Sequence, residues 1–479
     1  MHPEDLSPDI YGIETEYSGI IEGPYGQVRE LVGSCHSPDV ELGLYVEPEN
    51  KGSSHIHQQQ LEEAIRSCGI NPYRRGMLSN GGRLYIDPSG PEYCTPETRT
   101  AEEAVIRSFE GDDLVRAVLR HLTREGVIGD SQLNRKVVDH NRTSRGIHLN
   151  TTTTIHKDPC SRTVGKTAAL NVAKGAMFGS GGLLVDENGQ TSYHHSPRLS
   201  ITSEYSAAYA DYKLRPLVRL PFKEDYGSLR RVETVTSDAL NFGWPLRASL
   251  VATNALFRII ELGHEDLLPE LSHPVRAAQE VGEKGYKARI SAVNHQGEAR
   301  MIGPLDMLRE LCEVAYMIDA IEGTLDEESD QVLTEIIEVA DTLQRDEEAA
   351  ADRVESVMRW RSIQKKMESS GAKIGSDIIC RVDYGWDWLD ERGYAKQLRD
   401  KDYGWHGFKT RPRTSIYSQV AVEPPVDSRA TARVAALQAG LTVSDWHSVS
   451  TGLGEYQLNP SNPQLPDEVL DYIGASAAH

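Results

Sequence analysis

The chain is poor in cysteine, and its six cysteines lie far apart. They are Cys35, Cys68, Cys94, Cys160, Cys312 and Cys380. No two of them stand in Cys-x-x-Cys spacing, which argues against a zinc–thiolate site and against a dithiol redox pair. Scattered cysteines in a long chain are typical of a reducing compartment, so we expect a cytoplasmic protein.

Basic residues are outnumbered by acidic ones, and long apolar runs are absent from the sequence. Lys and Arg total 51 against 72 Asp and Glu, which gives a net charge of −21. A nucleic-acid-binding protein needs a basic face, which this balance argues against. No apolar run reaches membrane-spanning length, and the first residues have neither the basic nor the apolar region of a signal peptide. We therefore expect no nucleic-acid partner and no membrane association.

The remaining sequence predicts a large core with mixed secondary structure. Apolar residues at helical spacing predict helices over 101–125, 246–262 and 326–367, and strand-like stretches fall at 10–22, 146–155, 177–186 and 229–238. The glycine cluster at 179–182 lacks the ending of a phosphate-binding P-loop and predicts a turn. A polar, proline-containing stretch near 415–425 predicts a boundary between a domain over 1–418 and a small C-terminal domain over 419–479.

The most informative stretch follows an Asn-Gly-Gly turn at 80–82. Arg83, Tyr85 and Asp87 then alternate, so on a strand they share one face. Glu92 follows after a corner containing proline. A strand face with these charged side chains does not suit a hydrophobic core, because buried charges need partners. The stretch therefore predicts a site for a nucleotide phosphate, a metal ion and a catalytic carboxylate.

A second segment, near the N-terminus, fits the first. On a strand over 10–17, Glu14 and Glu16 lie on one face, where two neighbouring carboxylates repel unless a cation lies between them. Hard oxygen ligands suit Mg2+, often shared with phosphates. A solvated strand face is the alternative interpretation of these two residues alone. Together with the stretch from Arg83 to Glu92, they favour a metal site.

Two further residues, His148 and Arg231, carry chemistry of the same kind. His148 is a candidate metal ligand, and it shares a strand face with Asn150. Arg231, like Arg83, can hold phosphate oxygens by paired hydrogen bonds. Asp87 remains the candidate catalytic carboxylate of the first stretch, able to accept a proton as a general base.

These motifs resemble those of the Pup ligase and Pup deamidase (depupylase) family, which belongs to the glutamine-synthetase-like carboxylate–amine ligases. The resemblance rests on Gly-Ile-Glu-Thr-Glu-Tyr at 12–17 and on residues 80–96, and it continues at low identity at 146–150, 230–238, 424–430 and 445–446. It implies an α+β fold with a mostly antiparallel, curved sheet backed by helices. It also implies a small C-terminal domain that closes the nucleotide site.

The residues and the resemblance together predict ATP and Mg2+ as cofactors. The predicted metal ligands are Glu14, Glu16, Tyr85, Glu92, His148 and Glu233. The predicted ATP contacts are Arg83, Thr95, Asn150, Arg231, Arg429 and Trp446. A core aromatic of the small domain is an equally good interpretation of Trp446. Asp87 is the predicted catalytic residue, a base toward lysine in the ligases and implicated in attack on the amide or activation of water in the deamidases.

The function that we favour is an ATP- and Mg2+-dependent ligase. It would join the C-terminal glutamate of a small Pup-like modifier protein to a lysine of a target protein through an acyl phosphate. The motif at 12–17 favours this prediction. The alternative is a deamidase or depupylase that hydrolyses the same amide or isopeptide bond, which the long polar loop over 24–60 and the short spacing from Asp87 to Glu92 favour. A small-molecule carboxylate–amine ligase and an inactive modifier-binding protein are further alternatives.

The chain departs from the family pattern at three substituted positions, and it lacks one residue of the ligase form between Asp87 and Glu92. Gly90 stands where the ligases have His, Leu149 where both Pup enzymes have Glu, and Glu233 where they have His. Glu233 can still bind Mg2+, whereas Leu149 cannot replace a carboxylate. These departures predict a divergent member of the family.

Overall fold

The computed structural model describes residues 6–22, 29–32, 58–87, 90–140, 142–208, 214–293, 297–401, 403–409 and 422–477. Most of the polar loop predicted over 24–60 lies outside the described residues. The boundary predicted between 418 and 419 also lies outside them, so the division into two domains stays a prediction.

A six-stranded, wholly antiparallel sheet organises the molecule, in the order β12-β13-β7-β1-β5-β4. Its strands are β1 (Tyr11–Glu16), β4 (Arg83–Asp87), β5 (Gly90–Cys94), β7 (Ile147–Thr153), β12 (Lys223–Glu224) and β13 (Arg230–Thr234). Burial alternates along β1, because Tyr11, Ile13 and Thr15 face the core while Glu14 and Glu16 are half-buried on the other face. One face of the sheet is therefore apolar and helix-covered, and the other is polar.

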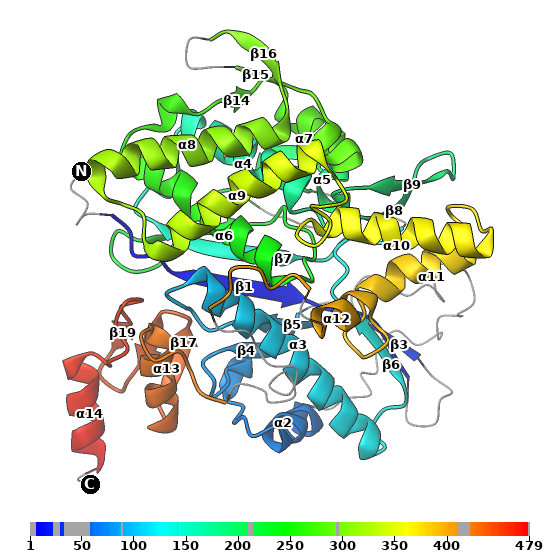
Figure 1. Cartoon of the computed structure of the whole chain (residues 1–479). Coiled ribbons are helices and arrows are strands. Elements are labelled where there is room, and N and C mark those ends of the chain that lie inside the picture. Colours follow the sequence, from blue (N-terminus) through cyan, green and yellow to red (C-terminus); the bar gives the residue numbers. More distant parts are fainter. Residues whose placement is uncertain are drawn as a thin grey trace.

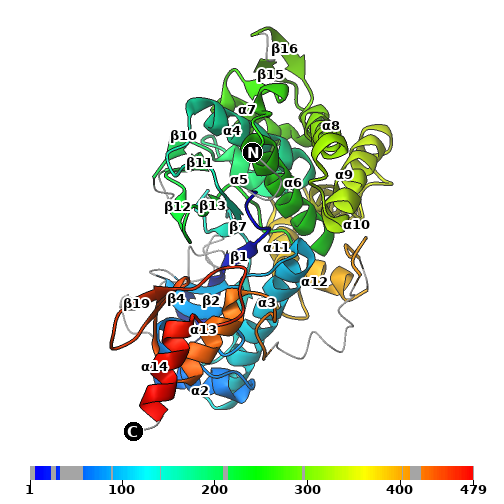
Figure 2. The ribbon, with the colours of Figure 1, turned by 90° about the vertical axis from the view of Figure 1, so that its left-hand side faces the viewer.

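Helices cover the apolar face (Figures 1 and 2). α3 (Ala101–Arg124) packs behind β1 and β5, and α6 (Gly243–Glu261) packs behind β7. α4, α8 and α9 pack in turn against α6. The other helices are α2 (Gln58–Ser67), α4 (Ser161–Met177), α5 (Pro197–Ser200), α7 (Pro274–Lys284), α8 (Pro304–Glu322), α9 (Glu327–Arg345), α10 (Glu355–Ser370), α11 (Asp377–Trp386) and α12 (Tyr394–Arg399). This arrangement confirms the predicted α+β class.

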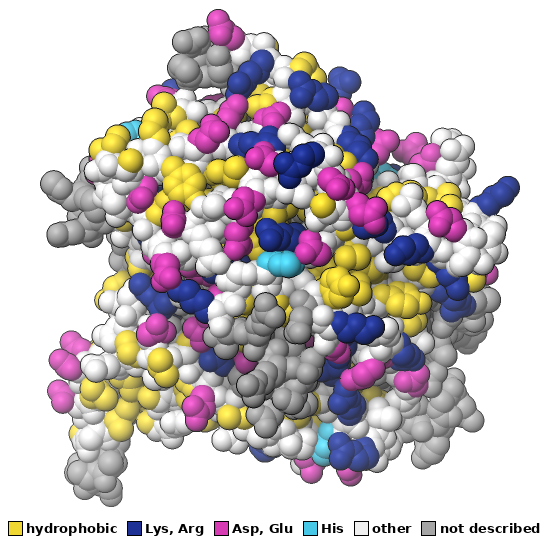
Figure 3. Space-filling view, in the orientation of Figure 1, with side chains coloured by type: hydrophobic (Ala, Val, Ile, Leu, Met, Phe, Trp, Pro, Cys, Tyr) yellow, Lys and Arg dark blue, Asp and Glu magenta, His cyan; other side chains and the backbone are white. Residues whose placement is uncertain are grey.

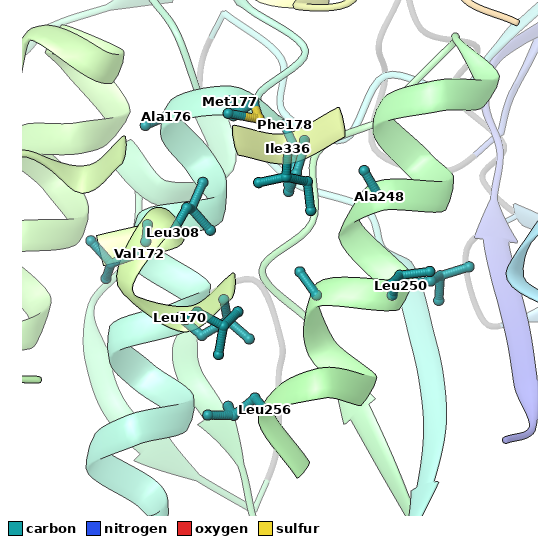
Figure 4. Packing of buried hydrophobic residues seen from close by; sticks show 14 of the residues in the cluster. Leu170, Val172, Ala176, Met177, Phe178, Ala248, Leu250, Leu256, Leu308 and Ile336 are labelled. Carbon is teal, nitrogen blue, oxygen red and sulfur yellow. The ribbon is translucent and has the colours of Figure 1, made fainter. Parts of the chain in front are cut away.

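The main core forms where α4, α6, α8 and α9 meet (Figure 4). Leu170 of α4, Leu250 of α6, Leu308 of α8 and Ile336 of α9 all belong to it and are buried. Almost every residue of α4 and α6 is buried, as expected for helices with neighbours on all sides. This core fixes the back of the sheet and leaves the polar face free for chemistry.

Short strands complete the fold away from the main sheet. They are β2 (Ser18–Glu22), β3 (Arg29–Val32), β6 (Ser131–Asn134), β8 (Gly182–Val185), β9 (Thr191–His194), β10 (Glu204–Ala207), β11 (Pro216–Arg219), β14 (Glu270–Leu271), β15 (Ile290–Val293) and β16 (Ala299–Ile302). β11 lies close to β13 of the main sheet. None of the helices in the described part of the chain is long and apolar enough to cross a membrane.

The C-terminal residues form a compact unit beside β4 and α2 (Figure 2). It contains α13 (Arg429–Gln438), the small sheet of β17 (Thr442–Asp445), β18 (Ser448–Ser450) and β19 (Glu455–Gln457), and α14 (Asp467–Ala477). Val449, Leu458 and Val469 form its own hydrophobic cluster, which Met77 of the main body joins. The unit is therefore packed onto the body next to the edge of the main sheet.

Several predicted elements differ from the observed ones. The strand predicted over 10–22 is divided at Tyr17, since β2 leaves the main sheet to pair with β3 and β6. The strand predicted over 177–186 is the end of α4, a turn and β8. The helix predicted over 326–367 is interrupted at 346–354, where the Asp346 side chain accepts the backbone N–H groups of Glu348 and Ala349. Such local bonds compete with helix continuation.

The surface in Figure 3 mixes acidic and basic side chains over the helix-covered side. No large area of one sign is visible there, although the net charge is −21. On this side, acidic and basic side chains are therefore interspersed rather than gathered into patches of one sign.

Candidate active site

Strand register brings the predicted residues together on the polar face of the sheet. Glu14 stands opposite Cys94 of β5 on one side and His148 of β7 on the other. One step along the face, Glu16 stands opposite Glu92. Tyr85 of β4 stands opposite Glu92, and Arg83 opposite Cys94. Segments far apart in the sequence therefore form two adjoining rows of polar side chains.

Glu16 and Glu92 form the first of these rows together with Tyr85. Glu16 Oε2 accepts the Gly146 N–H at 2.9 Å and lies 3.3 Å from Arg145 Nη1. The Tyr85 hydroxyl donates to Glu92 Oε2 at 2.6 Å. Burial, followed by the charge of Glu14, raises the pKa of Glu92 to about 7. Glu92 is thus a carboxylate whose charge is disfavoured here, and a divalent cation would stabilise it.

Glu14 and His148, which belong to the second row, form a cluster with Glu233 of β13. His148 Nδ1 lies 3.2 Å from Glu14 Oε2 and 3.1 Å from Glu233 Oε1, and ligand atoms of the three lie within 4.8 Å of one another. Burial lowers the pKa of His148, but its hydrogen bonds to the two carboxylates raise it to about 10. The imidazolium therefore supplies positive charge between two carboxylates. As a metal ligand it would first have to lose its proton.

Arg231 pairs with the other oxygen of Glu14. Its Nη1 donates to Glu14 Oε1 at 2.9 Å. Burial alone would raise the pKa of Glu14, but Arg231 and His148 lower it, so Glu14 is ionised. Arg231 and Glu14 both line the cavity described next, where a guanidinium can bind phosphate oxygens.

A cavity of ≈ 200 Å³ lies at the end of β1, β7 and β13, against the C-terminal unit. It is lined by Ile10, Tyr11, Gly12, Ile13, Glu14, Cys94, Thr95, Glu97, Asn150, Thr151, Thr152, Lys223, Glu224, Asp225, Arg231, Arg429, Trp446 and His447. Gly12 contributes no side chain, and the buried Oδ1 atom of Asn150 has no hydrogen-bond partner among the described residues. A ligand with a donor group in this cavity would satisfy Asn150.

Trp446 both lines this cavity and packs on the C-terminal hydrophobic cluster. The Arg433 guanidinium lies over its ring, 4.7 Å from the centroid, and Arg433 Nη1 donates to the Trp446 carbonyl at 2.7 Å. The two interpretations of Trp446 are therefore compatible, since Arg433 covers one face of the ring while the residue also lines the cavity.

We expect Trp446→Ala to raise the dissociation constant of a nucleotide by about tenfold or more, because stacking on a base contributes roughly 1–3 kcal/mol. Calorimetric titration with ATP would measure the change. Trp388→Ala, on a tryptophan that does not line the cavity, is the matched control. Equal affinities of the Trp446 variant and wild type would assign this residue to the core alone.

The other predicted ATP contacts lie around the same cavity or on the adjoining strand. Thr95 Oγ1 accepts the Ile13 N–H at 3.0 Å, so its hydroxyl also holds β1 in place. Arg429 is buried and ion-paired with both Glu97 and Asp225. Arg83 stacks 4.0 Å over the Tyr85 ring, and its Nε donates to the Arg75 carbonyl at 2.7 Å. Arg83 is therefore held on the polar face by its neighbours on the same strand and on the preceding turn.

Asp87 is the last residue of β4, and its backbone stands opposite Gly90. Its side chain lies outside the described part of the structure. The backbone position is at the end of the strand away from the Gly-Gly turn at 81–82. Its role stays a prediction.

Leu149 does not affect the polar face. It is 2% exposed and belongs to the main core, behind the sheet. Strand alternation places it opposite in direction to His148 and Asn150. The departure at this position therefore removes no ligand from the face described above.

The sequence did not reveal Arg219 and Lys223 as part of the site. Arg219 Nη1 and Lys223 Nζ lie 2.7 and 3.0 Å from Glu233 Oε2. β12 is only two residues long, which is too short for a periodicity signal. The one available signal was the alternation of Lys223 with Asp225 before the strand that carries Arg231.

We expect Glu92→Gln to raise the Mg2+ concentration needed for half-maximal ATP binding by at least about tenfold. The amide keeps the shape but removes the charge that a hard cation requires. Titrating Mg2+ into enzyme with fixed ATP measures this. Glu110→Gln is the matched control, because Glu110 is a carboxyl of α3, behind the sheet, whose pKa burial also raises to about 7. A normal Mg2+ requirement in the Glu92 variant would remove this residue from the metal set.

Comparison with known proteins decides the family. The profile of the Pup-ligase protein family matches residues 9–450. The chain belongs to the Pup ligase family. Members of this family and its Pup deamidase branch are enzymes of ligase or hydrolase type, which confirms the family and the enzyme class predicted from the sequence.

Relatives within the family include both kinds of enzyme. The chain is 24% identical over 412 residues to the Pup deamidase/depupylase of Mycolicibacterium smegmatis, covering 84% of this chain and 79% of that protein. It is 26% identical over 212 residues to the Pup–protein ligase of Kribbella flavida, covering 43% of this chain and 46% of the relative.

Solved structures of the Pup ligase PafA share the fold. The complex of PafA with Pup matches with a TM-score of 0.75 and 18% identity, over 100% of this chain and 94% of that one. The complex of PafA with ADP matches with a TM-score of 0.69 and 17% identity, over 91% and 97%. These matches confirm the predicted architecture of this Pup ligase family member.

Proposed function

We propose that this Pup ligase family member is an ATP- and Mg2+-dependent ligase. It would join the C-terminal glutamate of a Pup-like modifier protein to a lysine of a target protein. The observation that carries the proposal is the layout of the polar face. A cavity bounded by Trp446 lies at one end, the carboxylates of Glu14, Glu16 and Glu92 follow, and the strand that carries Asp87 ends at the other side.

The chemistry needs each of these parts. The modifier carboxylate attacks the terminal phosphorus of ATP, ADP leaves, and the resulting acyl phosphate is attacked at carbon by the lysine amine. Phosphate then leaves as the isopeptide forms. An ammonium cannot attack, so a base must take a proton from the amine, and we assign this step to Asp87. Arg231 and Arg83 would orient the phosphoryl oxygens.

The residues present fit Mg2+. Glu14, Glu16, Glu92 and the Tyr85 hydroxyl offer hard oxygen atoms on one face, and the raised pKa of Glu92 reflects a buried charge that is unfavourable without a cation. A bound Mg2+ would neutralise phosphate charge. One of the similar PafA structures is a complex with ADP and another is a complex with Pup, which supports nucleotide and modifier binding by this chain.

The second candidate function is hydrolysis of the same bond, as a deamidase or depupylase. The M. smegmatis relative, whose match covers most of both chains, carries that name. In this function Asp87 would attack the amide carbon or activate water. A cytoplasmic location suits both candidates, since ATP is available there and the described cysteines are free thiols.

One experiment separates the two directions. The purified chain is incubated with Mg2+, ATP and a lysine-bearing acceptor, together with a synthetic modifier ending in Gly-Gly-Glu or in Gly-Gly-Gln. For the ligase we expect an acceptor whose mass rises by that of the Glu-ending modifier less one water. Conversion of Gln to Glu without conjugate would establish the hydrolase instead. If the chain binds ATP but forms neither the conjugate nor the Glu-ending modifier, both functions are overturned.

A further inference from the structure

Glu233 was assigned to the metal set from its sequence motif, but its surroundings indicate another role. Its side chain is 3% exposed, and both oxygens face positive charge. Oε1 lies 3.1 Å from His148 Nδ1, and Oε2 lies 2.7 Å from Arg219 Nη1 and 3.0 Å from Lys223 Nζ. One carboxylate oxygen of Glu233 therefore faces two permanent cations, Arg219 and Lys223, while the other lies against the His148 ring.

The two cations are not buried with Glu233. The Arg219 side chain is 25% exposed and that of Lys223 40%. Lys223 lines the cavity that Trp446 and Arg231 also line, whereas neither Glu233 nor Arg219 is a lining residue. Neither cation makes a hydrogen bond of normal geometry to Oε2. The Lys223 ammonium, which lines the cavity, can therefore turn toward an anion there without first breaking an aligned hydrogen bond. Arg219 pairs with the same oxygen of Glu233 and is partly exposed, although it does not itself line the cavity.

Strand register also separates Glu233 from Glu92. Glu233 stands level with Gly12 through Asn150, whereas Glu92 stands level with Glu16. The two acids are thus four residues apart along the strands, about 13 Å, and three strands apart across the sheet, about 14 Å. One Mg2+, with ligands at about 2.1 Å, cannot take both, so Glu233 could share a metal ion only with the nearer Glu14 and His148.

We propose that Glu233 holds Arg219 and Lys223 in the nucleotide-free enzyme and competes for them with the phosphates of the nucleotide. Arg219 and Lys223 are then phosphate-binding residues, and Glu233 is a positioning residue that weakens nucleotide binding until the phosphates displace it. This inference rests on the proposed function, since it needs a nucleotide in the cavity. Removing Glu233 should therefore tighten nucleotide binding, whereas removing Arg219 and Lys223 should weaken it.

The test is calorimetric titration of ATP, in EDTA and with Mg2+, into four proteins. They are wild type, Glu233→Gln, the double variant Arg219→Gln/Lys223→Met, and the triple variant. We expect Glu233→Gln to tighten ATP binding by about tenfold, which is about 1.4 kcal/mol, in both conditions. The double variant should bind ATP at least tenfold more weakly than wild type, and adding Glu233→Gln to it should give no gain.

Glu224→Gln is the control for a general charge effect. Glu224 lines the same cavity but pairs with Lys157 and is 66% exposed. An equal gain in this variant, or a gain that persists in the triple variant, would overturn the proposal. Weaker Mg·ATP binding by Glu233→Gln would overturn it in favour of a metal ligand. Wild type that binds no ATP at all would instead overturn the proposed function.

Discussion

Asp87→Asn is expected to lower turnover by about 10²–10⁴, the range typical of a lost general base. The amide keeps the size of the side chain but cannot accept the proton. Nucleotide binding should persist, because the cavity near Trp446 and the carboxylates of Glu14 and Glu92 remain. The measurement is turnover and ATP affinity on the same sample, with a modifier present.

Asp87→Glu is the matched variant, since it keeps the carboxylate and moves it by one methylene. We expect it to retain part of the activity. Loss of ATP binding in the Asn variant would make Asp87 a metal-binding or structural residue. Normal turnover would remove it from the mechanism.

Glu97→Gln is expected to destabilise the protein by about 3–5 kcal/mol, the usual cost of breaking a buried ion pair. Glu97 Oε1 accepts from Arg429 Nε at 2.7 Å, and Oε2 accepts from Arg433 Nη2 at 2.6 Å. Both arginines are on α13 and are buried, and Arg433 also holds the carbonyls of Trp446 and Gly81. Glu97 thus joins the main sheet to the C-terminal unit.

The stability lost in the Glu97→Gln variant should decrease as the pH is lowered. Burial opposes the charge of Glu97, but the two arginines lower its pKa to about 2, against about 4.3 for an unperturbed glutamate. A carboxyl with a depressed pKa contributes stability that is fully present above about pH 4.3 and is lost as pH falls through about 2. At about 1.4 kcal/mol per pKa unit, the contribution is about 3 kcal/mol.

Urea denaturation of wild type and of Glu97→Gln, at pH 7 and again near pH 3, measures the free energy of unfolding of both proteins. The difference between the two proteins should shrink at the lower pH. Glu103→Gln is the control, because its pair with Arg107 at the surface of α3 should contribute less than about 1 kcal/mol. A Glu97 variant as stable as wild type at pH 7 would show that the arginines find other partners.

Local patterns were enough to predict the parts of the site that lie on regular strands. Alternation alone predicted that Glu14 and Glu16 share one strand face and that Arg83 and Tyr85 share another. The register of β1, β4 and β5 agrees with both predictions. The helix predicted over 101–125 is α3, which ends one residue earlier. These features depend on backbone period, which short-range sequence determines.

Features that depend on tertiary packing could not be predicted in this way. The contact of Glu97 with Arg433 joins residues 336 positions apart. The only hint was that Arg429 and Arg433 are four residues apart on α13 and so share a helix face. Likewise, Glu233 could be assigned to the metal only by its motif, because Arg219 and Lys223 reach it from outside its strand.

The central position of β1 has a consequence for synthesis of the protein. β1 pairs only with strands made later, since Glu14 stands opposite Cys94 and His148, which follow it by 80 and 134 residues. At about 5–20 residues per second, the nascent strand waits about 4–27 s for its two neighbours. An unpaired apolar strand invites aggregation, which charged side chains oppose. Glu14 and Glu16 would therefore protect the emerging chain on the ribosome before they serve the finished site.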